Sequence, residues 1–180
     1  STHLMQVAHN YEERGMKVIL IKPETDKKGG DKLVSRLGVE RKVDILCLEK
    51  MNIYEEIQKW QEVKFKVNCI LVDEVQFMTK EQVDQLFKIA VVLDIPVICY
   101  GLRTDFMMEG FEGSTRLLLL AHSIEEMKTI CKCGRKAILN GRKINGEFVF
   151  EGEQVAIDNI DNVQYESLCG HCYFRHKNNK

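Results

Sequence analysis

The chain has 180 residues, of which 44% are hydrophobic, so it can bury the core of one medium domain or of one domain with a small addition. Its 26 basic and 27 acidic side chains give a formal net charge of -1, which argues against a protein that binds nucleic-acid phosphates through a general excess of positive charge. No apolar run reaches the length of a membrane span and the N-terminus lacks the layout of a signal peptide, so we expect a cytoplasmic protein.

The first two thirds of the chain predict helices that alternate with apolar strands. Residues 2–14 space their apolar side chains as a helix does, and residues 17–22 form an apolar run that suits a strand covered on both faces. Residues 25–38 are polar and contain glycines, which predicts a mobile loop. The later predicted elements are a strand at 43–48, a helix at 53–60, a strand at 69–72, a helix from the N-cap Thr79 to residue 93, a strand at 96–101, and a helix or buried segment at 117–121. This alternation indicates a parallel sheet in an α/β domain.

The pattern changes after about residue 129, where turn residues and short β-like pieces accompany four cysteines. Cys131 and Cys133 form one close pair, and Cys169 and Cys172 form a second. Without a secretion signal, close pairs favour metal binding over disulfides. Four thiolates close a tetrahedral site for Zn²⁺ with no open position, so the metal is expected to be structural. His171 beside Cys172 is a weaker alternative ligand.

The start of the chain and one strand end favour phosphoryl transfer. Ser1 opens directly into a helix that precedes a buried strand, which is where a phosphate-binding loop ends in Gly-Lys-Ser/Thr, so we expect the glycines and the lysine to precede Ser1. Asp73 and Glu74 follow the strand at 69–72. One carboxylate there could hold Mg²⁺, and the other could accept a proton from an attacking hydroxyl. Taken separately, Ser1 also fits a helix N-cap, and Asp73 with Glu74 also fits a strand end with solvated charges.

A third feature is the segment Gly-Leu-Arg-Thr-Asp-Phe at residues 101–106, just past the strand at 96–101. Ligands of open α/β sheets bind at that edge, where the ring of Phe106 could stack on a flat base. A phenylalanine that packs in the core is the plainer interpretation.

Several motifs, in a shared order and spacing, carry a resemblance to a known family. They are Ser-Thr-x-Leu at 1–4, Tyr-Glu-Glu-Arg-Gly-Met at 11–16, Val-Asp-Glu-Val-Gln-Phe at 72–77, residues 94–106, the leucines at 117–120, residues 129–137, Glu-Gly-Glu-Gln-Val at 151–155, and Tyr-x-Ser-Leu-Cys at 165–169. Over essentially its whole length the chain resembles the zinc-containing type II thymidine kinases, especially the bacterial-type members.

The resemblance implies a P-loop NTPase-like parallel sheet with helices on both faces, in a nucleotide-binding α/β domain at residues 1–128 whose P-loop is truncated before Ser1. It implies a small zinc-ribbon-like domain at residues 129–180, with a lasso loop over the thymidine site. The implied reaction moves the γ-phosphate of ATP to the 5′-hydroxyl of thymidine, with Mg²⁺ and a structural Zn²⁺. The family is usually homotetrameric and is inhibited by its end product, dTTP.

The resemblance also implies roles for single residues. Glu74 matches the general base, and Asp73 matches the residue that holds Mg²⁺ through water. Ser1 matches the P-loop hydroxyl on Mg²⁺, and Asp26 matches an acidic loop residue near the metal. Phe106 matches the aromatic packed on thymine, and the backbone of the lasso at residues 155–165 is expected to read the polar edge of the base. The other residues expected around thymidine are Gln76, Phe77, Leu102, Asn140, Val155, Ile157 and Tyr165.

Two other interpretations stay open from the sequence. A nucleic-acid-dependent ATPase with a zinc ribbon would also carry Asp-Glu after an apolar strand, although the chain has no basic stripe with interleaved aromatics. The basic residues 175–180 predict only a short solvated tail. A catalytically inactive P-loop relative would share the same motifs. We expect neither a nucleic-acid nor a membrane partner.

Overall fold

The computed structural model describes residues 2–24, 32–34, 40–155 and 162–178. The chain forms two compact units, of which unit 1 comprises Ser1–Leu102 with Glu112–His122, and unit 2 comprises Arg103–Phe111 with Ser123–Lys180. Residues 103–111, which precede the expected boundary at residue 129, therefore group with the cysteine-containing part. No helix within these described ranges has both the length and the apolar character needed to cross a bilayer.

Unit 1 is built on a parallel sheet with the strand order β4-β1-β5-β6. The strands are β1 (Val18–Pro23), β4 (Ile45–Cys47), β5 (Cys69–Val72) and β6 (Val97–Cys99). Successive side chains of β1 point to opposite faces, so Ile19 and Ile21 join one buried cluster while Val18 and Leu20 join another. A strand buried on both faces explains why this run is apolar throughout.

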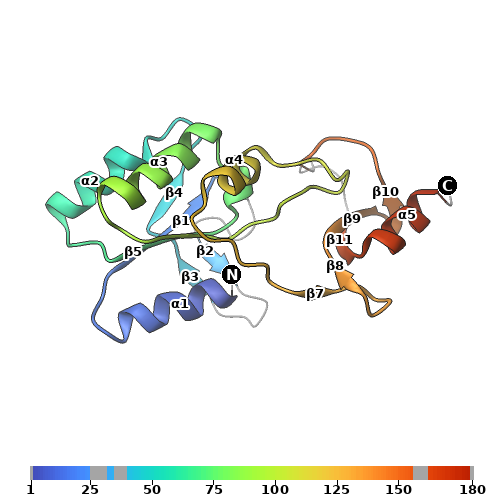
Figure 1. The fold of residues 1–180 in the computed structure, drawn as a ribbon, viewed down its shortest axis with the longest axis horizontal. Coiled ribbons are helices and arrows are strands. Elements are labelled where there is room, and N and C mark those ends of the chain that lie inside the picture. Colours follow the sequence, from blue (N-terminus) through green and yellow to red (C-terminus); the bar gives the residue numbers. More distant parts are fainter. Residues whose placement is uncertain (1, 25–31, 35–39, 156–161, 179–180) are drawn as a thin grey trace. The chain divides into compact units, whose positions relative to one another are not determined.

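Helices cover both faces of the sheet (Figure 1). They are α1 (Thr2–Glu12), α2 (Ile53–Val63), α3 (Lys80–Val92) and α4 (Glu112–Leu120). Leu4 and Ala8 of α1 pack with Leu20, whereas Ile57 of α2 packs with Ile21. Thr79 caps α3 through a reciprocal pair of bonds with Gln82, as a capping box does. The predicted α/β class, with a parallel sheet flanked by helices, is confirmed.

One expectation for unit 1 needs correction. Part of the predicted loop is a short antiparallel pair, β2 (Lys32–Val34) with β3 (Glu40–Lys42), because Leu33 buries its side chain in the cluster under α1. Residues 25–31 and 35–38 of that predicted loop lie outside the described residues. The leucines at 117–120 belong to helix α4, and Leu119 is 73% exposed, so the helical alternative predicted for this segment is the one observed.

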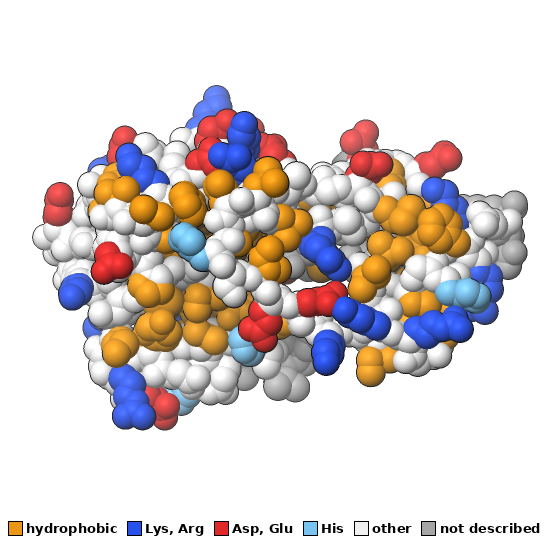
Figure 2. All heavy atoms as spheres, in the orientation of Figure 1, with side chains coloured by type: hydrophobic (Ala, Val, Ile, Leu, Met, Phe, Trp, Pro, Cys, Tyr) orange, Lys and Arg blue, Asp and Glu red, His pale blue; other side chains and the backbone are white. Residues whose placement is uncertain are grey.

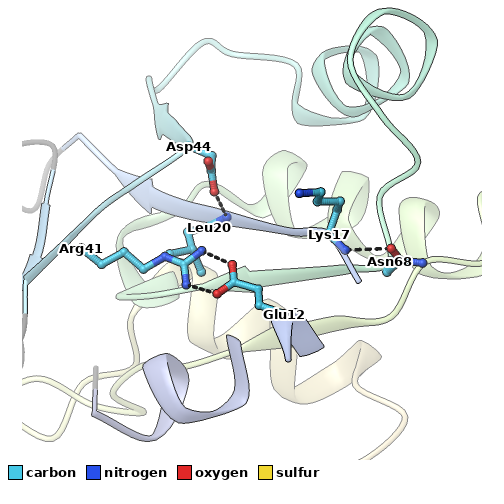
Figure 3. A network of polar contacts seen from close by, with 6 residues as sticks. All are labelled: Glu12, Lys17, Leu20, Arg41, Asp44 and Asn68. Atoms are coloured by element: carbon cyan, nitrogen blue, oxygen red, sulfur yellow. Dashed lines mark hydrogen bonds and ion pairs between the residues drawn. The ribbon is translucent and has the colours of Figure 1, made fainter. Parts of the chain in front are cut away.

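Polar contacts join α1, β1 and β3 (Figure 3). Arg41 donates two hydrogen bonds to the carboxylate of Glu12, at 2.9 and 2.6 Å. The Asp44 carboxylate accepts from the Leu20 N–H at 2.8 Å. A surface pair such as Glu12–Arg41 contributes about 0.2–1 kcal/mol, so these contacts orient α1 more than they stabilise the unit.

Unit 2 contains a three-stranded antiparallel sheet in which β9 lies between β10 and β11. Its elements are β7 (Thr129–Ile130), β8 (Lys136–Ala137), β9 (Leu139–Ile144), β10 (Glu147–Val149), β11 (Val163–Leu168) and α5 (Gly170–Asn178). Residues 175–178 of the predicted basic tail are mostly exposed, as expected, but they are helical. They continue α5, because Tyr173 on the same helix is fully buried against Phe150 and Leu168.

Candidate active site and cysteine cluster

The acidic pair comes directly after strand β5, at the carboxyl edge of the parallel sheet. Asp73 is buried, and its N–H donates to the Ile21 carbonyl at 3.0 Å, so it continues the pairing of β5 with β1. Glu74 adopts a left-handed backbone conformation with φ 52°, which is uncommon for a residue with a side chain. Such conformations concentrate where structure serves a ligand. The chain therefore turns sharply as it leaves the strand and presents two carboxylates at this edge.

Gln76 fixes the side chain of Glu74. Its Nε2 donates to Glu74 Oε2 at 2.5 Å, and its Oε1 accepts from the Leu102 N–H at 3.2 Å. The Gln76 side chain is 3% exposed and lies against Gly101, where an added Cβ would come within 2.6 Å of Gln76 Oε1. The amide thus bridges the acidic turn and the segment after β6. We expected Gln76 beside thymine, and that contact stays a prediction.

The start of helix α1 lies at the same edge of the sheet. The hydroxyl of Tyr100, which follows β6, shares a hydrogen bond of 3.2 Å with His3 Nδ1 in the first turn of α1. Helix N-termini offer free N–H groups and a favourable dipole to phosphate. Ser1 and Asp26 lie outside the described residues, so their predicted roles stay predictions.

The remaining candidates of unit 1 flank the acidic pair along the chain. Phe77 is partly buried in the short 3-10 helix η1 (Val75–Phe77), and the side chain of Leu102 is nearly half exposed. Unit 1 therefore contains Asp73, Glu74, Gln76, Phe77 and Leu102 of the predicted set.

Unit 2 contains the other candidates, and Asn140 contacts the loop that contains Phe106. Phe106 is 1% exposed, and its carbonyl accepts from the Tyr173 hydroxyl at 2.7 Å. Asn140 Nδ2 donates to the Thr104 carbonyl at 3.3 Å. Val155 and Tyr165 are about half exposed, while Ile157 lies outside the described residues. A ring as buried as that of Phe106 could meet a base only after its neighbours move.

Sequence reasoning missed Arg142, which is 4% exposed in the middle of β9. Its guanidinium carbon lies 3.7 Å from the centroid of the Phe106 ring, and it donates to the carbonyls of Glu153 and Gln154, just before the predicted lasso. An Arg-Lys pair in a short β-like piece gives no sign of burial, because such pairs are usually solvated.

The four predicted zinc ligands come together in unit 2. The Sγ atoms of Cys131, Cys133, Cys169 and Cys172 lie within 4.8 Å of one another, and the Cys133–Cys169 distance is 3.6 Å. A tetrahedral ion with metal–sulfur bonds of about 2.3 Å would place its sulfurs about 3.8 Å apart, whereas a disulfide requires about 2 Å. The cluster therefore fits a metal. His171 is exposed and is not part of this cluster.

Backbone N–H groups favour the thiolate forms that a metal requires. Those of Cys133 and Cys169 lower the pKa of Cys131 to about 6. The N–H of Cys172, at 3.4 Å from Cys169 Sγ, lowers the pKa of the Cys169 thiol. The neighbouring Cys133 side chain instead raises the pKa of the Cys172 thiol to about 12. Thiolates rather than thiols bind metals, so the backbone N–H groups at Cys131 and Cys169 favour a cation.

Comparison with known proteins then places the chain. The family model described as thymidine kinase matches residues 1–173. The chain belongs to the thymidine kinase family. It is 44% identical to a thymidine kinase of Mannheimia succiniciproducens, over 100% of this chain and 91% of the relative. The thymidine kinase of Enterobacteria phage T4 is 43% identical (94% of this chain, 86% of the relative), and that of Vibrio vulnificus is 46% identical (96% and 89%).

Family membership agrees with the site geometry. A member of the thymidine kinase family is a phosphotransferase, and unit 1 brings a helix N-terminus and two carboxylates to one sheet edge. The family predicted from the sequence motifs is thereby confirmed.

Proposed function

We propose that the protein is an ATP:thymidine 5′-phosphotransferase, which makes thymidine monophosphate for DNA precursor synthesis. The family match over residues 1–173 carries this proposal. The acidic pair after β5 supports it, because phosphoryl transfer needs positioned phosphates and a group that accepts the proton of the attacking hydroxyl.

In this proposal Glu74 is the general base. Its carboxylate takes the proton as the 5′-oxygen of thymidine bonds to the γ-phosphorus of ATP and the bond to the leaving ADP oxygen breaks. The bond from Gln76 to Oε2 holds the carboxylate in one orientation, so that the other oxygen is the one that accepts the proton. Mg²⁺, when bound, draws charge from the phosphates. Asp73 would hold it through water, and Ser1 and Asp26 would complete its surroundings.

Unit 2 supplies recognition of thymine in this proposal. Phe106 would pack on the base and the backbone of residues 155–165 would bond its polar edge, with Asn140, Val155, Ile157 and Tyr165 nearby. Backbone groups that lose their partner with a different base give strong discrimination, because unpaired buried polar groups are costly. Leu102 and Phe77 of unit 1 are proposed to contact the same nucleoside.

We propose that the cysteine cluster binds Zn²⁺ as a structural ion. Four sulfur ligands leave no position for a substrate, so the metal would act by joining residues 131–133 to residues 169–172. We also propose that the protein acts in the cytoplasm, where thiols stay reduced and available to the metal.

Homotetrameric assembly and inhibition by dTTP are part of the proposal too. Assembly is supported by apolar side chains on the surface of unit 1, where Figure 2 shows them in orange. Val91 and Val92 of α3 and Leu118 and Leu119 of α4 are each more than 40% exposed, and these two helices pack together. Neighbouring exposed apolar residues are typical of protein interfaces.

Replacing the proposed base tests the function most sharply. Glu74→Gln keeps the size of the side chain and should leave nucleotide binding and thermal unfolding unchanged, while turnover of thymidine falls by roughly 10² to 10⁴. Thymidine monophosphate formation and ATP binding are measured on the same preparation. Turnover within a few-fold of the parent would remove Glu74 from this role. A parent protein that binds ATP but forms no product would be an inactive relative.

A further inference from the structure

Arg142 occupies an unusual place for a charged side chain. It lies in the centre of β9, paired with Tyr165 of β11 and Val149 of β10, and it is 4% exposed. The acceptors of its three hydrogen bonds are all uncharged. Burying a cation is costly unless it is paired or hydrogen-bonded, so the contacts of this guanidinium indicate what its burial serves.

Those contacts reach both ends of the segment that was expected to form the lasso. Nη1 and Nη2 donate to the adjacent carbonyls of Glu153 and Gln154, at 2.7 and 2.8 Å, where the chain enters the segment. Nε donates to the Tyr165 hydroxyl at 3.0 Å, where the chain has returned to β11. A planar fork of donors matches two adjacent carbonyls, which an ammonium group cannot do.

The same side chain packs on the proposed thymine-stacking residue. Its guanidinium lies over the Phe106 ring, 3.7 Å from the centroid, as in a cation–π pair. Arg142 therefore covers one face of the ring. Asn140, two residues away on the same face of β9, bonds Thr104 in the loop that contains Phe106.

A second group of hydrogen bonds links the same segments. Gln154 Nε2 donates to Asp105 Oδ2 at 3.0 Å, while Asp105 Oδ1 accepts from the N–H groups of Met107 and Glu109, at 2.8 and 2.9 Å. Asp105 is buried and adjoins Phe106 in sequence. The entry of the segment and the loop around Phe106 are thus held together through Gln154 as well as through Arg142.

We propose that Arg142 is a positioning residue for thymine recognition, one that holds Glu153, Gln154 and Tyr165 against the ring of Phe106 without touching the substrate. This inference rests on the proposed function, and it names a residue that sets the binding of the nucleoside but not of ATP. Loss of Arg142 would remove the contact that Phe106 shares with Glu153 and Gln154, so the cost falls on thymidine affinity.

The test compares Arg142→Met and Arg142→Lys with Lys143→Met in the full-length protein. Lys143 is the next residue of β9, points to the opposite face and pairs with Glu166 at 2.7 Å, so its replacement removes a cation from the same strand without disturbing these contacts. We expect both Arg142 variants to raise the thymidine KM at least tenfold, with the ATP KM and the kcat at saturating thymidine within about threefold of the parent. Lysine should not rescue, because it lacks the fork. Lys143→Met should leave all three values near those of the parent.

A Tyr165→Phe variant covers the case in which Arg142→Met does not fold. It removes the acceptor of the Nε bond, so we expect a thymidine KM raised about two- to fivefold. Zinc content and cooperative unfolding establish that each variant is folded. An unchanged thymidine KM in folded Arg142→Lys and Tyr165→Phe would overturn the inference, and so would equal losses for thymidine and ATP. If the parent itself neither binds nor phosphorylates thymidine, the proposed function fails instead.

Discussion

Replacing Gln76 by methionine tests whether the orientation of the Glu74 side chain matters for catalysis, because Glu74 itself is kept. Methionine fills a similar volume and donates no hydrogen bond, so the 2.5 Å bond to Glu74 and the 3.2 Å bond from the Leu102 N–H are both lost. A hydrogen bond to a charged group contributes about 1.5–3 kcal/mol. If that free energy is expressed in the transition state, kcat falls about 10- to 100-fold, since each 1.36 kcal/mol corresponds to a factor of ten.

The loss should appear in kcat more than in stability. The Leu102 N–H loses its acceptor, which costs about 1 kcal/mol of folding free energy at this half-exposed position. Steady-state thymidine kinetics, with urea unfolding of the same variant, measure both effects.

Gln82 supplies the matched control for this experiment. It is also a buried glutamine of unit 1, but its amide donates to the carbonyls of Leu48 and Glu49, at 2.8 and 3.1 Å. Gln82→Met should therefore cost about 1–3 kcal/mol of stability and leave kcat of the folded enzyme unchanged. If Gln76→Met kept the kcat of the parent, Gln76 would not position the base. If Gln82→Met lowered kcat equally, the effect of Gln76→Met would be structural.

Three further predictions concern other parts of the molecule. Gly101→Ala should lower kcat about tenfold in the same assay, because its Cβ would come within 2.6 Å of Gln76 Oε1; a fully active, folded variant would contradict this close contact. Thr79→Ala should reduce the free energy of unfolding by about 0.5–2 kcal/mol in urea titrations without changing kcat, because it removes the cap of α3, and an unchanged midpoint would argue against the cap. Cys131→Ser should lose bound zinc in a chelator-dye assay, and unit 2 should lose with it binding energy on the order of 10 kcal/mol. The control Cys99→Ala should keep its zinc. A full equivalent of zinc retained by Cys131→Ser would refute the four-sulfur site.

Periodicity and strand-end chemistry predicted most of unit 1. The apolar runs in β1 and β5 are long enough to be read as strands buried on both faces, and the capping box at Thr79 locates the start of α3. The β2–β3 pair escaped notice because it depends on one buried side chain, Leu33, in an otherwise polar stretch. A single tertiary contact of this kind leaves no periodic signal.

The candidate site likewise has one part that the sequence predicted and another that it did not. The spacing of the four cysteines was enough to predict that they lie together, because close cysteine pairs in a chain without a secretion signal favour metal binding. The links between residues far apart in sequence could not be predicted. Gln76 contacts Leu102, and Arg142 reaches Phe106 and Glu153, through pairings that depend on the folded arrangement. A polar side chain reads as solvated until its neighbours are known.

The central claim is that a carboxylate-assisted transfer moves the terminal phosphate of ATP to a nucleoside alcohol. The most direct measurement incubates the full-length protein, free of DNA, with ATP labelled in its γ-phosphate and with either thymidine or 5′-deoxythymidine, which lacks the accepting hydroxyl. We predict labelled thymidine monophosphate from thymidine alone, in an amount that falls at least a hundredfold when Glu74 is replaced by glutamine. Release of labelled inorganic phosphate that requires added DNA, with no labelled nucleotide product, would contradict the account.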